Sequence, residues 1–596
     1  MSSKRFLSMT PKELKAEGVV RPDVILVSGD AYIDSAYSGV AVIGRVLEAA
    51  GYSVGIIAQP DVSEDKDICA LGEPRLFWGV SSGCVDSEIA NYTALGKPRR
   101  SCDFTPGGIN NRRPHRACIA YVNLIRRYFK NTVPLVLGGI EASLRRVAHY
   151  DQRTDKIRKS ILPDSKADIL VYGMGEKSVL EIADRLKHKK SLDNIPGTCV
   201  MSASAPPEYL GLPDFDQVER DPRAFAAMFK TFYQNSLGPC GKGMVQKYGD
   251  RFLVHHSPSS LPGRQELDRI YELPFLNDAH PLCRSMGHIR ALETIKDSIT
   301  THRGCYGECS FCSIAVHQGR SVISRSVESI VREAGKLSQS EGFAGVIRDV
   351  GGPTANMYGS GCKNMSLGRP CLDRHCTGFE GVCSRLVPGH NKQKRLLEKI
   401  SALPGIKQVN IASGIRYDLI LADDIHGPGY LEQAIKHHIP GQMKIAPEHC
   451  ADHILELMNK PGSADVLEFA RRYRRLAEKL KKDVYLSCYV IAAHPGCGLR
   501  DMRRFADFAR WNLRFSPEQV QIFTPAPSTR STVMYHCGMD PFTGKKVWTE
   551  KSVTGRKQQK DAVRGRAADK TRTGGSRKKR FSPGKTSKPP KNKQRH

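Results

Sequence analysis

The sequence predicts an α/β protein made of two parallel β/α units, an N-terminal doubly wound sheet and a partial barrel of six β/α repeats, followed by a disordered basic tail. Two observations predict the units: apolar strand-like runs alternate with amphipathic helical runs over residues 23–200 and again over 286–550, as in parallel sheets. A third predicts the tail, because residues 551–596 are rich in Gly, Ser, Pro, Lys and Arg and poor in aliphatic side chains, a composition that cannot form a core.

The first unit follows a polar lead at residues 1–22 and opens with the segments DVILVSGD, GVAVIGRVLEAAG and YSVGIIAQPD, which read as strand, helix and strand. Further strands are expected at 77–82, 133–139 and 167–173. Ligands of such sheets bind beyond the carboxyl ends of the strands, and here those ends are glycine-rich: Gly29-Asp30, Gly138-Gly139 and Gly173-Met174-Gly175-Glu176. The first strand lacks a GxGxxG motif, which argues against a nicotinamide site.

Residues 201–285 are Pro-rich and irregular apart from one helical run, DPRAFAAMFKTFYQNS, and are expected to form a connector. The second unit then has six strand candidates, at 298–304, 345–351, 408–414, 442–447, 483–493 and 519–525. Six alternating units fit an incomplete barrel, whose active site would occupy the carboxyl edge of the strands.

Composition limits the class of protein. Hydrophobic residues make up 40% and charged residues 26% of the 596 residues, as in globular proteins of several domains. No stretch reads as membrane-spanning, and the polar N-terminus does not resemble a secretory signal, so the cytoplasm is expected. The net charge of +30 is concentrated in the basic tail, which is either a solubilising segment or a tether for RNA.

Three cysteines follow the first strand of the second unit. Cys305, Cys309 and Cys312 have the spacing C-x3-C-x2-C on a loop beside Gly304 and Gly307. Ferredoxin-type [4Fe-4S] clusters use four cysteines, so three would leave one iron open to an exchangeable ligand, which is typical of catalytic metal sites. The competing interpretation is a zinc site completed by His302 or His317.

A second cysteine group lies in an insertion at 359–390. Cys362, Cys371, Cys376 and Cys383 have the spacing C-x8-C-x4-C-x6-C, which indicates a metal that staples a polar loop. An auxiliary iron–sulfur cluster and a structural zinc both fit this spacing, and unligated thiols are the alternative. Glu448, His449 and His494 follow later strands and are candidates for contacting a substrate.

The first cysteine motif, with Phe311 before its third cysteine, resembles the signature of radical S-adenosylmethionine (SAM) enzymes. Up to about residue 550 the chain resembles the YgiQ-type UPF0313 family within this superfamily. The segments that carry the resemblance are GDAYID, GRVLEAAGY, GGIEASLRR, YGMGE, THRGCYGECSFCSIAVHQGR, DVGGPTANMYG, SGIRYDL, KIAPEH, LMNKPG, AAHPG and TPAPSTRSTVMY.

The resemblance implies a radical SAM barrel with a [4Fe-4S] cluster that cleaves SAM reductively to a 5′-deoxyadenosyl radical, with electrons from a donor such as flavodoxin or ferredoxin. It implies that Gly351 and Gly352 contact the methionyl amine, and that Ser413 and Arg416 contact the ribose and carboxylate of SAM. The substrate is not predicted.

The resemblance also implies that the N-terminal unit is similar to cobalamin-binding domains. Whether cobalamin binds is left open, because the chain has no DxHxxG motif and has Ser35-Ala36 where the family usually has His-Pro. Two alternatives to the leading interpretation stay open: a radical methyl- or methylthio-transferase that acts on RNA or protein, and a non-catalytic iron–sulfur protein that binds RNA or acts as a sensor.

Overall fold

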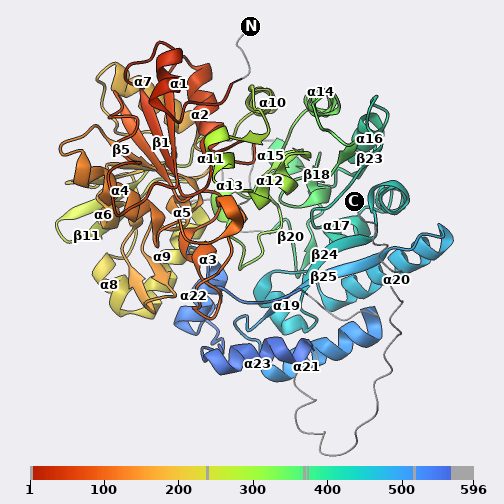
Figure 1. Cartoon of the computed structure of the whole chain (residues 1–596). Coiled ribbons are helices and arrows are strands. Elements are labelled where there is room, and N and C mark those ends of the chain that lie inside the picture. Colours follow the sequence, from red (N-terminus) through yellow and green to blue (C-terminus); the bar gives the residue numbers. More distant parts are fainter. Residues whose placement is uncertain (1–4, 236–240, 367–370, 372–374, 514–518, 565–596) are drawn as a thin grey trace, which may run out of the picture.

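Two β/α units lie side by side in the computed structural model (Figure 1), the first coloured red to yellow and the second green to blue. The structure describes residues 5–235, 241–366, 371, 375–513 and 519–564. Within these residues, every helix is too short or too polar to cross a membrane.

The first unit is built on a nine-stranded sheet of order β10-β11-β12-β9-β8-β5-β4-β1-β3. Its five consecutive strands β3, β1, β4, β5 and β8 are parallel, which confirms the predicted doubly wound sheet. In sequence order they are β1 (Val24–Ser28), β3 (Val54–Ala58), β4 (Phe77–Ser81), β5 (Leu135–Leu137) and β8 (Ile169–Val171).

Helices cover both faces of this sheet. Ile25 and Val27 of β1 pack into the same core as α4 (Ala117–Tyr128), whereas Val24 and Leu26 pack with α2 (Gly39–Ala49) and α7 (Glu176–Lys187). Successive side chains of a strand point to opposite faces. Burial on both faces explains why these strands appear in the sequence as continuous apolar runs.

The predicted connector at 201–285 is not irregular throughout, because it completes this sheet. β9 (Thr198–Ser202) is followed by β10 (Leu210–Gly211), β11 (Met244–Tyr248) and β12 (Arg251–His255); β9 pairs with β8, and β12 with β9, both antiparallel. β11 and β12 form a hairpin around Gly249-Asp250, a two-residue turn that the sequence displays. The predicted helix in this span is present as α9 (Pro222–Asn235).

The second unit contains all six predicted parallel strands and forms the expected partial barrel. β14 (Ser298–Thr300) pairs with β18 (Asp349–Gly351), and β17 (Val346–Ile347) pairs with β23 (Gln408–Val409). β24 (Gln442–Glu448), β25 (Tyr485–Ala492) and β26 (Val520–Ile522) form a second group. A bridge between Ile415 and Ile445 joins the two groups. The outer helices include α14 (Val327–Ser338), α16 (His390–Ser401), α20 (Ser463–Lys479) and α21 (Leu499–Phe508).

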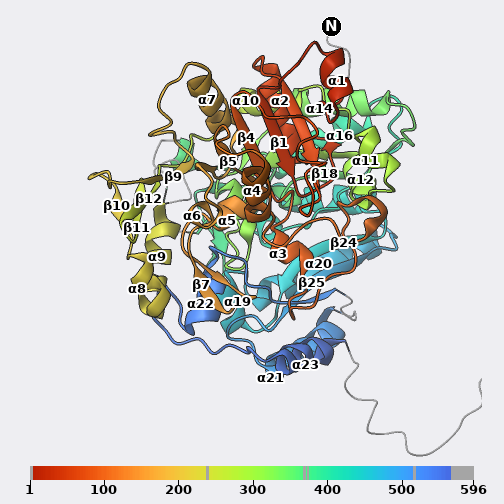
Figure 2. The same ribbon diagram turned by 60° about the vertical axis from the view of Figure 1, so that its left-hand side comes forward.

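The predicted disordered tail begins too early. Residues Val553–Val563 form helix α23, which lies against α21 in both views (Figures 1 and 2). Its inner face is largely polar: Gln559 donates to Cys497 O at 2.9 Å and accepts from Ala493 N at 2.9 Å, and Arg556 donates to Phe523 O at 3.1 Å. Hydrophobic periodicity does not detect a face of this kind. Residues 565–596 lie outside the described residues.

Candidate functional site

The loop with the first cysteine group lies between a strand and a helix. Cys305 follows β15 (His302–Arg303), and Cys312 caps the start of α13 (Ser313–Gln318). Gly304 has φ of +79°, and a Cβ there would lie 2.0 Å from Ser321 O, so only glycine fits. Cys312 N donates to Cys309 O at 2.9 Å. The predicted order of strand and cysteine loop is therefore present.

The structure brings the three thiols together in a polar shell. Burial and the nearby Cys309 thiol raise the pKa of Cys305, and the same causes raise the pKa of Cys312 to about 12. Gly307 N donates to Cys305 Sγ at 3.3 Å, and Arg416 Nη1 lies 3.9 Å from Cys309 Sγ. Buried thiols bear a negative charge only beside a cation. The loop thus has the donors and the burial that a thiolate-bound metal cluster requires.

Within the described part of the chain, no three His, Cys, Asp or Glu side chains are arranged around one point as a single metal ion requires. A cubane does not need that arrangement, since each of its cysteine ligands binds a different iron.

Gly351 and Gly352 pack tightly against neighbouring side chains beside this loop. A Cβ at Gly351 would lie 2.9 Å from Ser413 Oγ, and a Cβ at Gly352 would lie 2.6 Å from His302 Cε1. The Gly351 carbonyl accepts hydrogen bonds from Thr301 N at 2.7 Å and from Thr301 Oγ1 at 3.0 Å. Both acceptor positions of that carbonyl are therefore occupied, which the sequence pattern could not indicate.

Ser413 and Arg416 lie after β23, and each has a partner in the protein. Ser413 Oγ donates to Asp349 Oδ2, and Asp349 Oδ1 accepts from Ser413 N at 3.1 Å. Arg416 forms a fork with Asp418, with Nε to Oδ1 at 2.9 Å and Nη2 to Oδ2 at 2.6 Å. Asp418 thus occupies the Nε and Nη2 edge of the Arg416 guanidinium, which was expected to bind the carboxylate of SAM. The remaining nitrogen, Nη1, faces the cysteine loop.

The three later candidates have different surroundings. His494 Nε2 lies 2.7 Å from Ser531 Oγ and its Nδ1 lies 2.8 Å from Pro495 O, and His449 Nδ1 accepts from Ala451 N at 3.0 Å. These two rings are held within the protein. Glu448 ends β24 in a left-handed conformation, with φ of +67°, and burial raises its pKa although Lys460 opposes the shift.

The second cysteine group is packed beside the first. The Cys376 thiol interacts electrostatically with Cys362, Cys383 and Cys371, so all four predicted cysteines lie near one another. Cys376 and Cys383 pack against the same apolar cluster as Cys305, and Tyr306 is one of the buried residues of that cluster. Residues 367–370 and 372–374 of this insertion lie outside the described residues.

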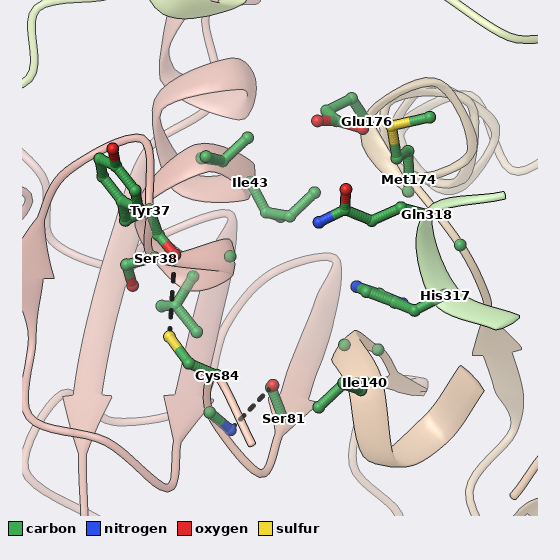
Figure 3. Close-up of a pocket in the computed structure, with 18 of the residues that line it drawn as sticks. Tyr37, Ser38, Ile43, Ser81, Cys84, Ile140, Met174, Glu176, His317 and Gln318 are labelled. Carbon is green, nitrogen blue, oxygen red and sulfur yellow. Dashed lines mark hydrogen bonds between the residues drawn. The ribbon is translucent and has the colours of Figure 1, made fainter. Parts of the chain in front are cut away.

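A cavity of about 480 Å³ lies between the two units. The N-terminal unit contributes the glycine-rich strand ends 138–139 and 173–175, and the barrel contributes Asp349, Gly352 and Ser413. In Figure 3, His317 and Gln318 reach the cavity from the side opposite Tyr37 and Cys84. Two of the predicted cofactor contacts, Gly352 and Ser413, therefore meet the predicted sheet edge at one cavity, whereas Gly351, Arg416 and the three cysteines are not among its lining residues. Gly29 is not in its wall, and Asp30 forms a buried ion pair with Arg113.

The sequence did not indicate that two polar residues, His302 and Arg303, line this cavity. Burial lowers the pKa of His302 to about 4, and its Nε2 has no hydrogen-bond partner among the described residues. Arg303 pairs with Glu176 at the start of α7 and so links the two units. His302 and Arg303 both belong to the segment THRGC. The position of this segment at the start of the cysteine loop is the feature of the sequence that could have identified them.

Comparison with known proteins gives the family. The Radical SAM N-terminal family model matches residues 6–298. A UPF0313 protein of Fusobacterium nucleatum is 50% identical over 560 residues, covering 94% of this chain and 98% of the relative. A UPF0313 protein of Thermotoga neapolitana is 46% identical over 567 residues, covering 94% and 98%.

Solved structures with a similar fold are more distant. The radical SAM methyltransferase TsrM from Kitasatospora setae, with cobalamin and a [4Fe-4S] cluster bound, aligns with a TM-score of 0.47 at 14% identity over 88% of this chain and 83% of that chain. OxsB, a cobalamin-dependent SAM radical enzyme, gives 0.47 at 11% identity over 82% and 52%. The sequence relatives decide the assignment: the chain belongs to the UPF0313 family of radical SAM proteins.

Proposed function

We propose that this protein is a radical SAM enzyme in which Cys305, Cys309 and Cys312 hold a [4Fe-4S] cluster and the fourth iron binds SAM. When bound and reduced by one electron, the cluster and SAM supply a 5′-deoxyadenosyl radical, which removes a hydrogen atom from a substrate. The observation that carries the proposal is the single loop of three clustered, partly buried thiols, which has hydrogen-bond donors directed at the sulfurs of Cys305 and Cys309.

The residues around the loop adjust the charge at the sulfurs. Gly307 N–H and Arg416 Nη1 face the sulfurs of Cys305 and Cys309, and donors of this kind stabilise the electron-rich, reduced state of an iron–sulfur cluster. Asp418 fixes the position of Arg416 by its two hydrogen bonds. Arg416 therefore acts on the cluster rather than by clamping the cofactor carboxylate.

The cavity side of the loop fits a nucleoside cofactor. Gly352 and Ser413 line the cavity. Because glycine has no side chain and that of serine is small, these positions leave room for a methionyl group and a ribose. Because Thr301 occupies the Gly351 carbonyl, Gly352 is the backbone acceptor for the methionyl amine. Asp349, which already holds Ser413, is placed to accept a hydrogen bond from a ribose hydroxyl. The remainder of the cavity, between the units, would take the substrate and keep water from the radical.

Release of 5′-deoxyadenosine tests this proposal. Protein reconstituted without oxygen and given dithionite and SAM should form 5′-deoxyadenosine. A Cys305→Ala, Cys309→Ala, Cys312→Ala variant should form none, and the exposed-cysteine control Cys69→Ala should match the unmodified protein. Equal product from the triple variant, or none from the unmodified protein, would refute the assignment.

Methyl transfer with cobalamin is a second candidate function. The cavity favours it, because it lies at the carboxyl ends of the parallel strands of the N-terminal sheet, where doubly wound sheets bind cofactors. Protein incubated with hydroxocobalamin and passed through a desalting column should retain the absorbance of the corrin. Loss of all corrin on the column would exclude this candidate.

A further inference from the structure

The described residues of the insertion with the second cysteine group form one short helix, α15 (Lys363–Ser366), and two small β-ribbons. β19 (Gly361–Cys362) pairs with β22 (Leu386–Val387), and β20 (Thr377–Gly378) pairs with β21 (Gly381–Val382). Each strand has two residues, and isolated ribbons of this size are not stable in water. The fully buried residues of the adjacent apolar cluster are Tyr306, Met357, Leu386 and Leu419, of which only Leu386 belongs to the insertion.

The two ribbons bring the cysteines to one place. Cys362 lies opposite Leu386 in the first ribbon, and Cys376 and Cys383 flank the second, where Cys383 N donates to Cys376 O at 2.9 Å. The Cys376 thiol interacts electrostatically with the other three thiols of the group. Four thiols that lie near one another can together ligate a metal centre.

This cysteine group touches the first cysteine loop. Tyr306, next to Cys305, is 3% exposed and interacts electrostatically with Cys376 and Cys362. Glu308 of the same loop contacts His375 Nδ1 at 3.2 Å through Oε2, and His375 precedes Cys376. The other oxygen of Glu308 accepts from Tyr233 Oη at 2.8 Å. The insertion thus contacts the loop at Tyr306 and at Glu308.

The position of the group favours iron–sulfur over zinc. Cys371 is exposed, whereas Cys305 lies beneath the insertion within the shared apolar cluster. An electron that enters on the Cys371 side would reach the first loop through the apolar cluster that the two cysteine groups share. Zinc has no redox chemistry and could not carry that electron, but a cluster with four cysteine ligands could.

We propose that Cys362, Cys371, Cys376 and Cys383 bind a second [4Fe-4S] cluster, which transfers electrons to the cluster on the Cys305 loop. It accepts one electron from a low-potential one-electron donor protein at the Cys371 side, passing from the 2+ to the 1+ state, and returns to 2+ when the electron moves on. All four of its irons have protein ligands, so it does not bind SAM. The choice of iron–sulfur over zinc and the destination of the electron rest on the proposed function; the binding of a metal by the four thiols does not.

Metal content tests this site independently of SAM cleavage. The full-length protein reconstituted with iron and sulfide should hold about eight irons, as two cubanes require. The Cys305, Cys309, Cys312 triple Ala variant should keep about four irons and, after reduction, an electron paramagnetic resonance signal that SAM does not change. A triple variant without iron, or zinc in place of iron in protein purified without oxygen, would overturn the proposal.

Single substitutions provide the matched comparison. Cys371→Ser changes an exposed ligand that is not needed for packing, and it should lower the iron content of the triple variant from about four towards zero. Cys69→Ser, at another exposed thiol, should leave it unchanged. Unchanged iron in Cys371→Ser would overturn the ligand set. Eight irons without 5′-deoxyadenosine formation would refute the proposed function but not this second site.

Discussion

Gly352 packs against the ring of His302, since a Cβ there would lie 2.6 Å from His302 Cε1. His302 is completely buried and cannot move aside at low cost, because protein interiors are close-packed. A side chain at position 352 would therefore clash with packed protein, besides occupying space that we propose for the cofactor.

We expect Gly352→Ala to weaken SAM binding at least tenfold, which is about 1.4 kcal/mol, while the iron content stays unchanged. The matched control is Gly335→Ala in α14, where a Cβ meets nothing within 4 Å; it should leave binding intact and stabilise the helix by about 0.5–1 kcal/mol. Equilibrium dialysis of SAM with reconstituted protein measures the effect. Equal affinity in both variants would show that Gly352 is not at the cofactor site.

At the scale of elements, α23 closes the face of α21 and the end of β25. Removing α23 would leave Ala493 N and Cys497 O without the partners that Gln559 provides, and would expose the side chains that pack around Val563. A chain ended after residue 551 should lose roughly 2–4 kcal/mol of unfolding free energy. A chain ended after residue 564 should match the full-length protein in urea unfolding. Equal stability of the two truncations would mean that α23 does not support the barrel.

The sequence predicted elements with strong periodicity and missed those held by other means. All six barrel strands and the five parallel strands of the first sheet follow from apolar runs. The hairpin of β11 and β12 joins its sheet through antiparallel pairing with distant strands, and α23 docks through Arg556 and Gln559. In the site, the spacing of the cysteines was enough to identify them. The hydrogen bonds between Arg416 and Asp418 and between Thr301 and Gly351 could not be predicted, because they depend on how the folded chain packs.

The whole molecule encloses several neutral histidines, and this makes its stability depend on pH. Burial lowers the pKa of His302, His317 and His449 to about 4, whereas an unfolded histidine titrates near 6.5. Between these values the unfolded chain binds more protons than the folded one, so stability falls as the pH falls from about 6.5 towards 4. Each such histidine contributes on the order of 3 kcal/mol to that loss.

We expect the midpoint of thermal unfolding to decrease steadily from pH 7 to pH 5. His449→Gln should make the decrease shallower, because it removes one group that must be protonated on unfolding. His188→Gln, at the half-exposed C-cap of α7, should leave the slope unchanged. A midpoint that stays constant over this range would contradict the burial of these rings as neutral groups.

The cavity of the molecule lies between the edge of the N-terminal sheet and the barrel, and our proposal is that a cluster on the Cys305 loop binds SAM through an open iron. The most direct test is the electron paramagnetic resonance spectrum of the reduced protein, prepared without oxygen, before and after SAM is added. We predict that SAM changes the signal of the cluster on Cys305, Cys309 and Cys312. A spectrum that SAM leaves unchanged would contradict the central claim that this loop binds the cofactor through an open iron.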